Sequence, residues 1–272
     1  MGVINVTPDS FSDGGLALDP QRAADLAVAM EAAGADLIDV GAESTRPGAI
    51  PVGTADEMAR VRPVLQALAK RVRLPISIDT YKSEVADLAL AEGASIVNDI
   101  SGLQYDPRLG ALTAARGAAL VLMHTRGRPQ DMYAHAEYAD VVGEVAADLQ
   151  AAVARARAAG IAAESILLDP GLGFAKRAAQ SLAVLAGLER LTTLEFPLLV
   201  GPSRKSFMAP ATGAVHAADR DWPTAAAVTA AVLAGAHIVR VHRVAEMVQV
   251  VRLADAIRDA AIRDAAIRVG QT

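Results

Sequence analysis

The sequence predicts an α/β protein, a (β/α)8 or TIM barrel in a single domain, and three observations lead to this prediction. The chain has 272 residues, and one such barrel takes about 250. Apolar residues make up 53% of the sequence and aromatic residues only 3%, so Ala, Val, Leu and Ile must fill the core, as in parallel strands covered by helices. Short β-branched or leucine-rich segments alternate with longer, alanine-rich amphipathic segments.

Eight strand–helix units follow one another along the chain. The expected strands are 1–6, 36–40, 75–78, 95–98, 119–123, 165–168, 197–200 and 237–241. The expected helices include 20–33, 55–70, 83–92, 138–159 and 224–235. Eight units in one chain favour a closed barrel, because no other segment is left to cover the edges of an open sheet. A Rossmann-like open sheet is the structural alternative.

Several expected helix ends carry the residues that helix ends prefer. Asp19 and Pro20 stand at the start of the first helix, and Gly34, Gly93 and Gly160 lie just past three helix ends. The chain is expected to form a single domain, 1–272, in which residues 258–272 are a helical tail. A short repeat, AIRDA-AIRDA-AIR, covers residues 256–268 and so makes up most of this tail. We expect this repeat to extend the last helix as a solvated extension, in preference to a partner-binding motif.

Composition excludes several functional classes. A net charge of −5 without any long basic segment argues against a nucleic-acid partner. The chain has no cysteine, so disulfides and thiolate metal sites are excluded. Its apolar segment 225–236 is too short to cross a bilayer, so we expect no membrane partner and a cytoplasmic protein.

Polar residues stand directly after the expected strands. They are Asn5, Asp39, Asp79, Asn98, His124, Asp169, the segment 203–205, Arg240 and His242. Capping of the next helix explains any one of them, but it explains a repeated pattern poorly. In a barrel all of these positions meet at the carboxyl-terminal mouth.

The two kinds of polar residue predict a substrate with two ends. Asp79, Asn98 and Asp169 offer acceptors and one amide to the edge of a flat heterocycle that carries N–H donors. The cationic or N–H donors expected opposite them are Arg46, Arg204, Lys205, Arg240 and His242. Such donors suit an anionic leaving group. The sequence therefore predicts a heterocycle joined to a phosphate-like group.

Two glycine-containing segments, 7–15 and 43–53, are candidate lids over this mouth, although plain turns are the alternative.

Three other sequence motifs do not meet the requirements of the sites that they resemble. Segment 201–206 lacks the glycines of a phosphate-binding loop, and 171–174 is too short for a dinucleotide fingerprint. The five histidines have no zinc-binding spacing, so we expect no transition-metal site.

Eight motifs in this order resemble the dihydropteroate synthase family from the first residue to about residue 257. They occupy 2–15, 39–48, 77–82, 98–102, 122–124, 169–176, 203–207 and 240–242. The resemblance implies condensation of 6-hydroxymethyl-7,8-dihydropterin diphosphate with p-aminobenzoate, giving 7,8-dihydropteroate and pyrophosphate in folate biosynthesis. It also implies that pyrophosphate leaves first and that the amine then captures a pterin-methyl cation.

The resemblance further implies a role for each matching residue. The pterin ligands are Asp79, Asn98, Met123, Asp169, Lys205 and Arg240, although Met123 can also be read as core. The diphosphate ligands are Asn5, Thr45, Arg240 and His242, with Asn5 also holding Mg2+. The p-aminobenzoate ligands are Phe11, Arg46, Pro47, Phe174, Ser203 and Lys205, with Asp9 on the first loop. The catalytic set is Lys205, Asp79, Asp169, Arg240 and Arg46. Sulfonamide binding and a homodimer formed through the last helices are implied as well.

Three departures from the family pattern keep alternatives open. The chain begins within the first strand, which is expected to loosen the floor of the barrel, and Pro223 and Arg243 replace residues usual in the family. A catalytically silent pterin-binding paralogue is therefore one alternative function. A methyltetrahydrofolate:corrinoid methyltransferase is another, but that family lacks the two loop motifs and the SRKS segment at 203–206.

Overall fold

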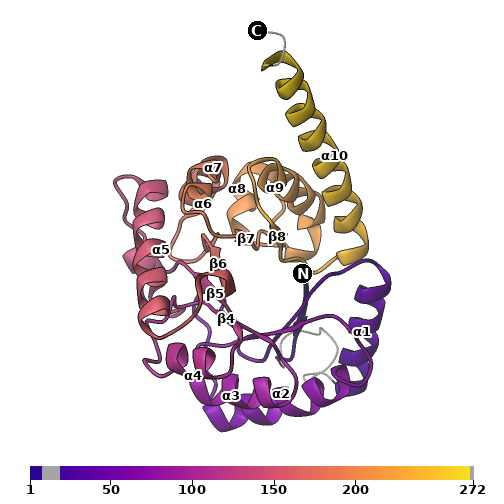
Figure 1. Cartoon of the computed structure of the whole chain (residues 1–272), viewed down its shortest axis with the longest axis vertical. Helices are drawn as coiled ribbons and strands as arrows, with labels where there is room; N and C mark the ends of the chain where they lie inside the picture. Colours follow the sequence, from indigo (N-terminus) through magenta and orange to yellow (C-terminus); the bar gives the residue numbers. More distant parts are fainter. Residues whose placement is uncertain (8–18, 270–272) are drawn as a thin grey trace.

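A computed structural model describes residues 1–7 and 19–269, with side chains described as far as residue 264. Eight parallel strands surround the centre of the molecule (Figure 1). Six of them form one sheet in chain order: β1 (Gly2–Asn5), β2 (Ile38–Gly41), β3 (Ile76–Asp79), β4 (Ile96–Asp99), β5 (Ala119–Met123) and β6 (Ile166–Asp169). The other two, β7 (Leu199–Val200) and β8 (Ile238–Val239), pair with each other.

Two short contacts join the six-stranded sheet to the β7–β8 pair and close the barrel. Between β6 and β7, a parallel bridge links Leu168 to Leu198. On the other side, Gly2 bridges to Val241, and the Val241 amide donates to the Met1 carbonyl at 2.9 Å. The (β/α)8 prediction is confirmed. The seventh and eighth strands are only two residues long, and isolated bridges make the remaining contacts between them and their neighbours in the barrel.

The helices lie outside the strands. Their bounds are α1 Pro20–Ala32, α2 Thr54–Leu68, α3 Ser83–Ala91, α4 Leu109–Ala115, α5 Val141–Ala158, α6 Ala178–Ala186, α7 Glu189–Thr192, α8 Ala209–Thr212, α9 Asp221–Leu233 and α10 Val244–Val269. Short 3-10 turns lie at Met132–His135, Ala163–Ser165, Ser206–Met208 and Ala217–Arg220. The far end of α10 projects away from the barrel (Figure 1), and the helix contains the whole repeat at 256–268.

Two helices begin three residues away from the start that the sequence predicts. Helix α5 begins three residues late, because the Asp140 side chain accepts from the Gly143 amide at 3.1 Å and caps the helix. Helix α9 begins at Asp221, so Pro223 lies in its first turn, where proline does little harm. Asp19 caps α1 as predicted, by accepting from the amide of Gln21.

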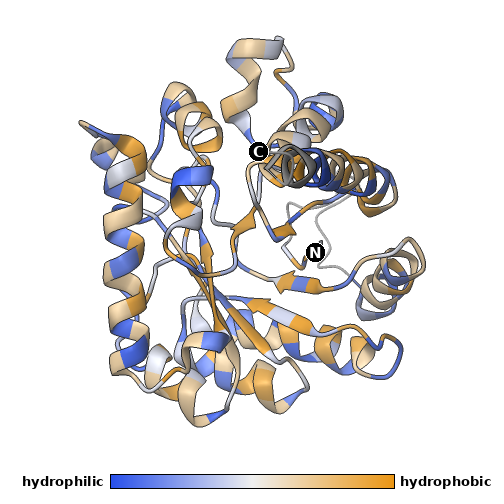
Figure 2. Cartoon of the chain, turned by 45° about the horizontal axis from the view of Figure 1, so that its top comes forward, coloured by the Kyte–Doolittle hydropathy of each residue, from blue (hydrophilic) through white to orange (hydrophobic). Residues whose placement is uncertain are grey.

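The core lies between the strands and the inner faces of the helices, and apolar residues dominate the strands (Figure 2). Ile4, Ile38 and Ile78 are fully buried on neighbouring strands, while Ala23 and Ala27 are buried on α1. Small alanine side chains let the helices approach the sheet closely, and Leu, Ile and Val supply most of the packed volume. No helix among residues 19–269 is both long enough and apolar enough for a transmembrane span.

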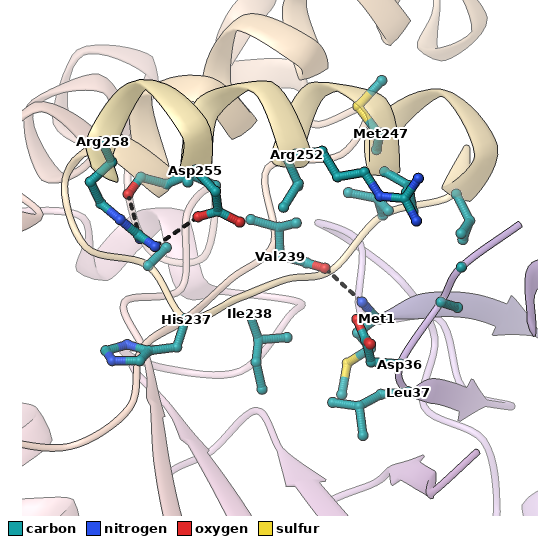
Figure 3. A pocket seen from close by; sticks show the side chains of 18 of the residues that line it. Met1, Asp36, Leu37, His237, Ile238, Val239, Met247, Arg252, Asp255 and Arg258 are labelled. Carbon is teal, nitrogen blue, oxygen red and sulfur yellow. Dashed lines mark hydrogen bonds and ion pairs between the residues drawn. The ribbon is translucent and has the colours of Figure 1, made fainter. Parts of the chain in front are cut away.

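A cavity of about 700 Å³ lies at the amino-terminal end of the strands, between the starts of β1 and β2, β8 and α10 (Figure 3). The Met1 ammonium donates to the Val239 carbonyl at 3.0 Å beside it, and burial lowers the pKa of this ammonium. On α10, Arg258 pairs with Asp255 at 2.8 Å. β1 itself still pairs with four residues of β2. This cavity is at the opposite end of the barrel from the predicted site residues.

Candidate active site at the carboxyl ends of the strands

The predicted site residues lie at or just beyond the carboxyl ends of the strands, on different sides of one mouth. The strands contribute Asn5 from β1, Asp79 from β3, Asn98 from β4, Met123 from β5 and Asp169 from β6. The loops after β2, β6, β7 and β8 contribute Thr45, Arg46, Pro47, Phe174, Ser203, Lys205, Arg240 and His242. Asp9 and Phe11 lie outside the described residues.

Arg240 joins two carboxylates that are far apart in the sequence. Its Nε donates to Asp39 Oδ2 at 2.6 Å, and its Nη2 donates to Asp79 Oδ2 at 2.9 Å. Asp39 is fully buried, and its Oδ2 also accepts from the Asn98 amide at 3.3 Å. These four residues therefore form one connected cluster within the barrel mouth.

Burial raises the pKa of two carboxyl groups at the mouth. Burial raises the pKa of Asp79 to about 7, and the neighbouring Arg240 only partly offsets this effect. Burial also raises the pKa of Asp169, whose Oδ1 accepts from the Gly171 amide at 2.7 Å. Groups with such shifts accumulate in sites that bind or react with ligands.

Lys205, on the loop after β7, lies near enough to Asp169 for the two charges to affect one another. Its Nζ donates to the Leu172 carbonyl at 2.6 Å and lies 4.7 Å from the centre of the Phe174 ring. Burial lowers the pKa of Lys205 to about 8, although the charge of Asp169 acts in the opposite direction. The lysine therefore remains largely protonated at neutral pH and contacts the loop that follows β6.

His242 and Ser203 form a pair on the basic side of the mouth. Ser203 Oγ is 2.8 Å from His242 Nδ1 and also accepts from the His242 amide at 3.2 Å. Because that hydroxyl accepts from the amide, its own proton is available for Nδ1, and the neutral imidazole then carries its proton on Nε2. Burial, together with the charges of Arg240, Arg204 and Arg46, lowers the pKa of His242 to about 4.

The remaining predicted residues are peripheral. Arg46 and Pro47 are exposed on the loop between β2 and α2. This loop contacts the one after β5, because the Gly48 amide donates to the Pro129 carbonyl at 2.9 Å. Arg204 pairs with Asp221 at 2.7 Å. Arg243, one of the departures from the family pattern, is exposed and pairs with Glu246, so it does not point into the cluster around Arg240.

Comparison with known proteins assigns the family. Residues 1–242 match the pterin binding enzyme family. The chain belongs to this family. This pterin-binding enzyme is 46% identical in sequence to the dihydropteroate synthase of Synechocystis, over 94% of its own length and 89% of that protein.

Two solved structures resemble this family member closely. A dihydropteroate synthase from Yersinia pestis, in complex with a sulfonamide drug, is 41% identical with a TM-score of 0.90, over 95% of this chain and 93% of that one. A dihydropteroate synthase from Xanthomonas albilineans, with 4-aminobenzoic acid, is 40% identical with a TM-score of 0.88, over 94% of this chain and 92% of that one.

Sequence reasoning placed Asp39 at the mouth and included Lys176 in the motif 169–176, but it gave neither residue a role of its own. Asp39 is an acid within the apolar segment LIDVG, a signal that it faces either a partner or a ligand. Within the part of the chain that the structure describes, its Oδ1 atom and the Ser77 hydroxyl have no hydrogen-bond partner. Lys176 follows the glycines of the β6 loop, where a lysine would ordinarily be expected at the surface.

Proposed function

We propose that this pterin-binding enzyme is a dihydropteroate synthase, which joins a dihydropterin diphosphate to p-aminobenzoate and releases pyrophosphate. The observation that carries the proposal is the division of one barrel mouth into two sides. Largely buried acceptors from Asp79, Asn98 and Asp169 form one side. The other side holds His242, which feels the charges of Arg204 and Arg46, and Arg240 stands between the two sides. A heterocycle with an anionic leaving group matches both sides, and the similarity to named synthases supports the same assignment.

In this proposal the pterin ring lies against the acidic side. Asp169 and Asp79 accept hydrogen bonds from N–H groups on the ring edge. The side-chain amide of Asn98 donates to an acceptor on the same edge. Met123 packs against the ring, since it is buried at the end of β5. Arg240 is held by Asp39 and Asp79 and covers the ring face. Lys205, at a pKa of about 8, supplies a positive charge on the opposite side.

The diphosphate lies against the basic side. His242 donates from Nε2–H to a phosphate oxygen, because Ser203 occupies its Nδ1. Thr45 adds a hydroxyl donor, and Arg240 adds positive charge. As the C–O bond to the pterin methylene breaks, its electron pair moves to the leaving diphosphate, and these donors stabilise the growing negative charge.

Magnesium fits this site through a single protein ligand. Among the described residues no cluster of three or more acidic or histidine side chains is suited to a metal. Mg2+ is commonly held by few protein groups together with substrate phosphates, and the amide oxygen of Asn5, at the end of β1, is such a group. When bound there, the ion neutralises charge on the diphosphate.

The arylamine occupies the outer part of the mouth. Phe174 and Lys205 border it from the β6 and β7 loops, and Ser203 lies behind them. Arg46 and Pro47 approach from the β2 loop. Asp9 and Phe11, which lie outside the described residues, are proposed to serve the same subsite on the strength of the family resemblance. After pyrophosphate departs, the amine nitrogen bonds to the methylene carbon and loses a proton. Sulfonamides mimic the arylamine in this proposal.

The wider setting of the proposal is a cytoplasmic homodimer. The acidic chain has a net charge of −5, and its last helices offer a self-association surface because Leu253 and Ile257 are exposed on α10. The substrates and sulfonamides are its small-molecule partners, with neither nucleic acid nor membrane involved.

The first test measures pyrophosphate release by the purified chain with dihydropterin diphosphate, p-aminobenzoate and Mg2+. We expect steady release, with 7,8-dihydropteroate appearing in equal amount by mass spectrometry. Omitting the arylamine is expected to abolish product formation. Binding of the pterin without arylamine-dependent release would refute the synthase and favour the silent paralogue. Methyl transfer to a corrinoid would instead favour the methyltransferase.

A further inference from the structure

Lys176 is a buried lysine that has no part in the proposed reaction. Its side chain is among the largest that are fully buried, at 1% exposure. Three acceptors lie within hydrogen-bond distance of its Nζ atom: His124 Nδ1 at 2.7 Å, the Phe174 carbonyl at 3.0 Å and the Gly171 carbonyl at 3.1 Å. A buried amino group is tolerated only when its N–H donors are satisfied in this way, and burial lowers the pKa of Lys176 well below its usual value.

A chain of polar contacts leads from this lysine to the surface. His124 Nε2 is 3.0 Å from Asp148 Oδ2, which also accepts from Arg126 at 3.0 Å. Asp148 can only accept, so His124 carries its proton on Nε2 and presents a lone pair from Nδ1 to Lys176. Burial lowers the pKa of His124 to about 4, which keeps the imidazole neutral at physiological pH. The imidazole therefore offers a lone pair to an N–H group of Lys176.

The loop between β6 and α6 adopts a backbone that needs such support. Gly171 and Gly173 have φ angles of +67° and +79°, and Ala175 has +47° despite its side chain. The loop also approaches the end of β5 closely, since a Cβ on Gly171 would be only 2.0 Å from the His124 carbonyl oxygen. Lys176 contacts both segments and so ties the loop to the strand.

The same loop carries two groups that contact Lys205. The Leu172 carbonyl accepts from Lys205 Nζ, and the Phe174 ring lies beside that ammonium. Lys176 donates to the carbonyl of Gly171, next to Leu172, and to the carbonyl of Phe174 itself. Any movement of the loop would therefore displace Lys205 and the wall of the arylamine subsite together.

We propose that Lys176 is a positioning residue: through the Gly171 and Phe174 carbonyls it fixes the β6 loop, and the loop in turn fixes Lys205 and Phe174 for the arylamine. Its effect on turnover rests on the proposed function. His124 and Asp148 orient Lys176 from the other side. The lysine contacts neither substrate, so its removal should alter how the arylamine binds more than how the pterin binds.

The test compares Lys176→Met, which keeps the stem and removes the donors, with Lys70→Met at an exposed position. We expect the KM for p-aminobenzoate to rise by about 10- to 100-fold in Lys176→Met, as for a misplaced substrate group. The KM for the dihydropterin diphosphate should change less than about threefold. Amide hydrogen exchange at residues 172–175 should accelerate, while exchange in β5 stays slow. Lys70→Met should match the parent chain in all three measurements.

A second variant guards against misfolding of the first. Asp148→Asn lies at the exposed end of the contact chain, so it should fold and show the same selective rise in arylamine KM at a smaller size. Equal rises in both KM values, or faster loop exchange without any change in arylamine KM, would overturn the positioning role. An inactive parent chain would refute the proposed function alone, because the exchange comparison still decides whether Lys176 holds the loop.

Discussion

Arg240→Met is expected to reduce the free energy of unfolding by about 3–5 kcal/mol at pH 7 and kcat/KM by more than about 100-fold. The guanidinium is 20% exposed and pairs with both Asp39 and Asp79. Removing it leaves two buried carboxylates without their countercharge, which is among the most destabilising changes that a protein interior can suffer. Urea denaturation measures the first effect, and pyrophosphate release measures the second.

The loss in Arg240→Met should also depend on pH. The folded-state pKa of Asp79 is already raised to about 7 from 3.8, so the folded chain binds more protons than the unfolded chain between these values. Its stability must therefore improve as pH falls from about 7 towards 4, and more so without Arg240. Arg243→Met, at an exposed position, is the matched control and should stay within about 0.5 kcal/mol. A pH-independent loss equal in both variants would contradict this account.

Lys205→Ala is expected to lower kcat/KM by about 10²- to 10³-fold with little loss of stability. The ammonium contacts the Leu172 carbonyl and the Phe174 ring at the mouth, where a positive charge acts directly on bound substrates. Its lowered pKa means that burial already disfavours its charge, so the folded state gains little from it. Pyrophosphate release and thermal unfolding measure the two effects, with Lys70→Ala as the exposed control.

The pH profile separates charge from shape in the role of Lys205. With a pKa of about 8, the lysine loses its proton as pH rises through 8, so parent activity should decline above that pH. Lys205→Arg keeps its charge at all these pH values, and its remaining activity should show no decline near pH 8. An unchanged decline in Lys205→Arg would assign the titration to another group and contradict the charge role.

Much of the fold was predictable because each apolar strand is followed by an amphipathic helix with its own end signals. Asp19 and the glycines at 34, 93 and 160 gave helix ends within a few residues. The closure was not predictable in detail. β7 and β8 are short, and the bridges from Leu168 and Gly2 depend on strand twist and tilt around the whole barrel, which local patterns do not encode.

The candidate site was predictable as a set of positions, because parallel strands bring their carboxyl ends together. The pairings within it were not. Arg240 meets Asp39 and Asp79 across 201 and 161 residues of sequence, and only packing selects these partners. The role of Lys176 was missed because its three acceptors include two backbone carbonyls, which have no signature in the sequence.

We expect the substrates to bind at the carboxyl-terminal mouth and not in the cavity of about 700 Å³ at the other end of the barrel. A crystal structure of the chain with pteroic acid tests this most directly. We expect the pterin ring between Asp79, Asn98 and Asp169, with the benzoate near Phe174 and Lys205. Pteroic acid seated between Met1, β8 and α10, with an empty mouth, would contradict the account.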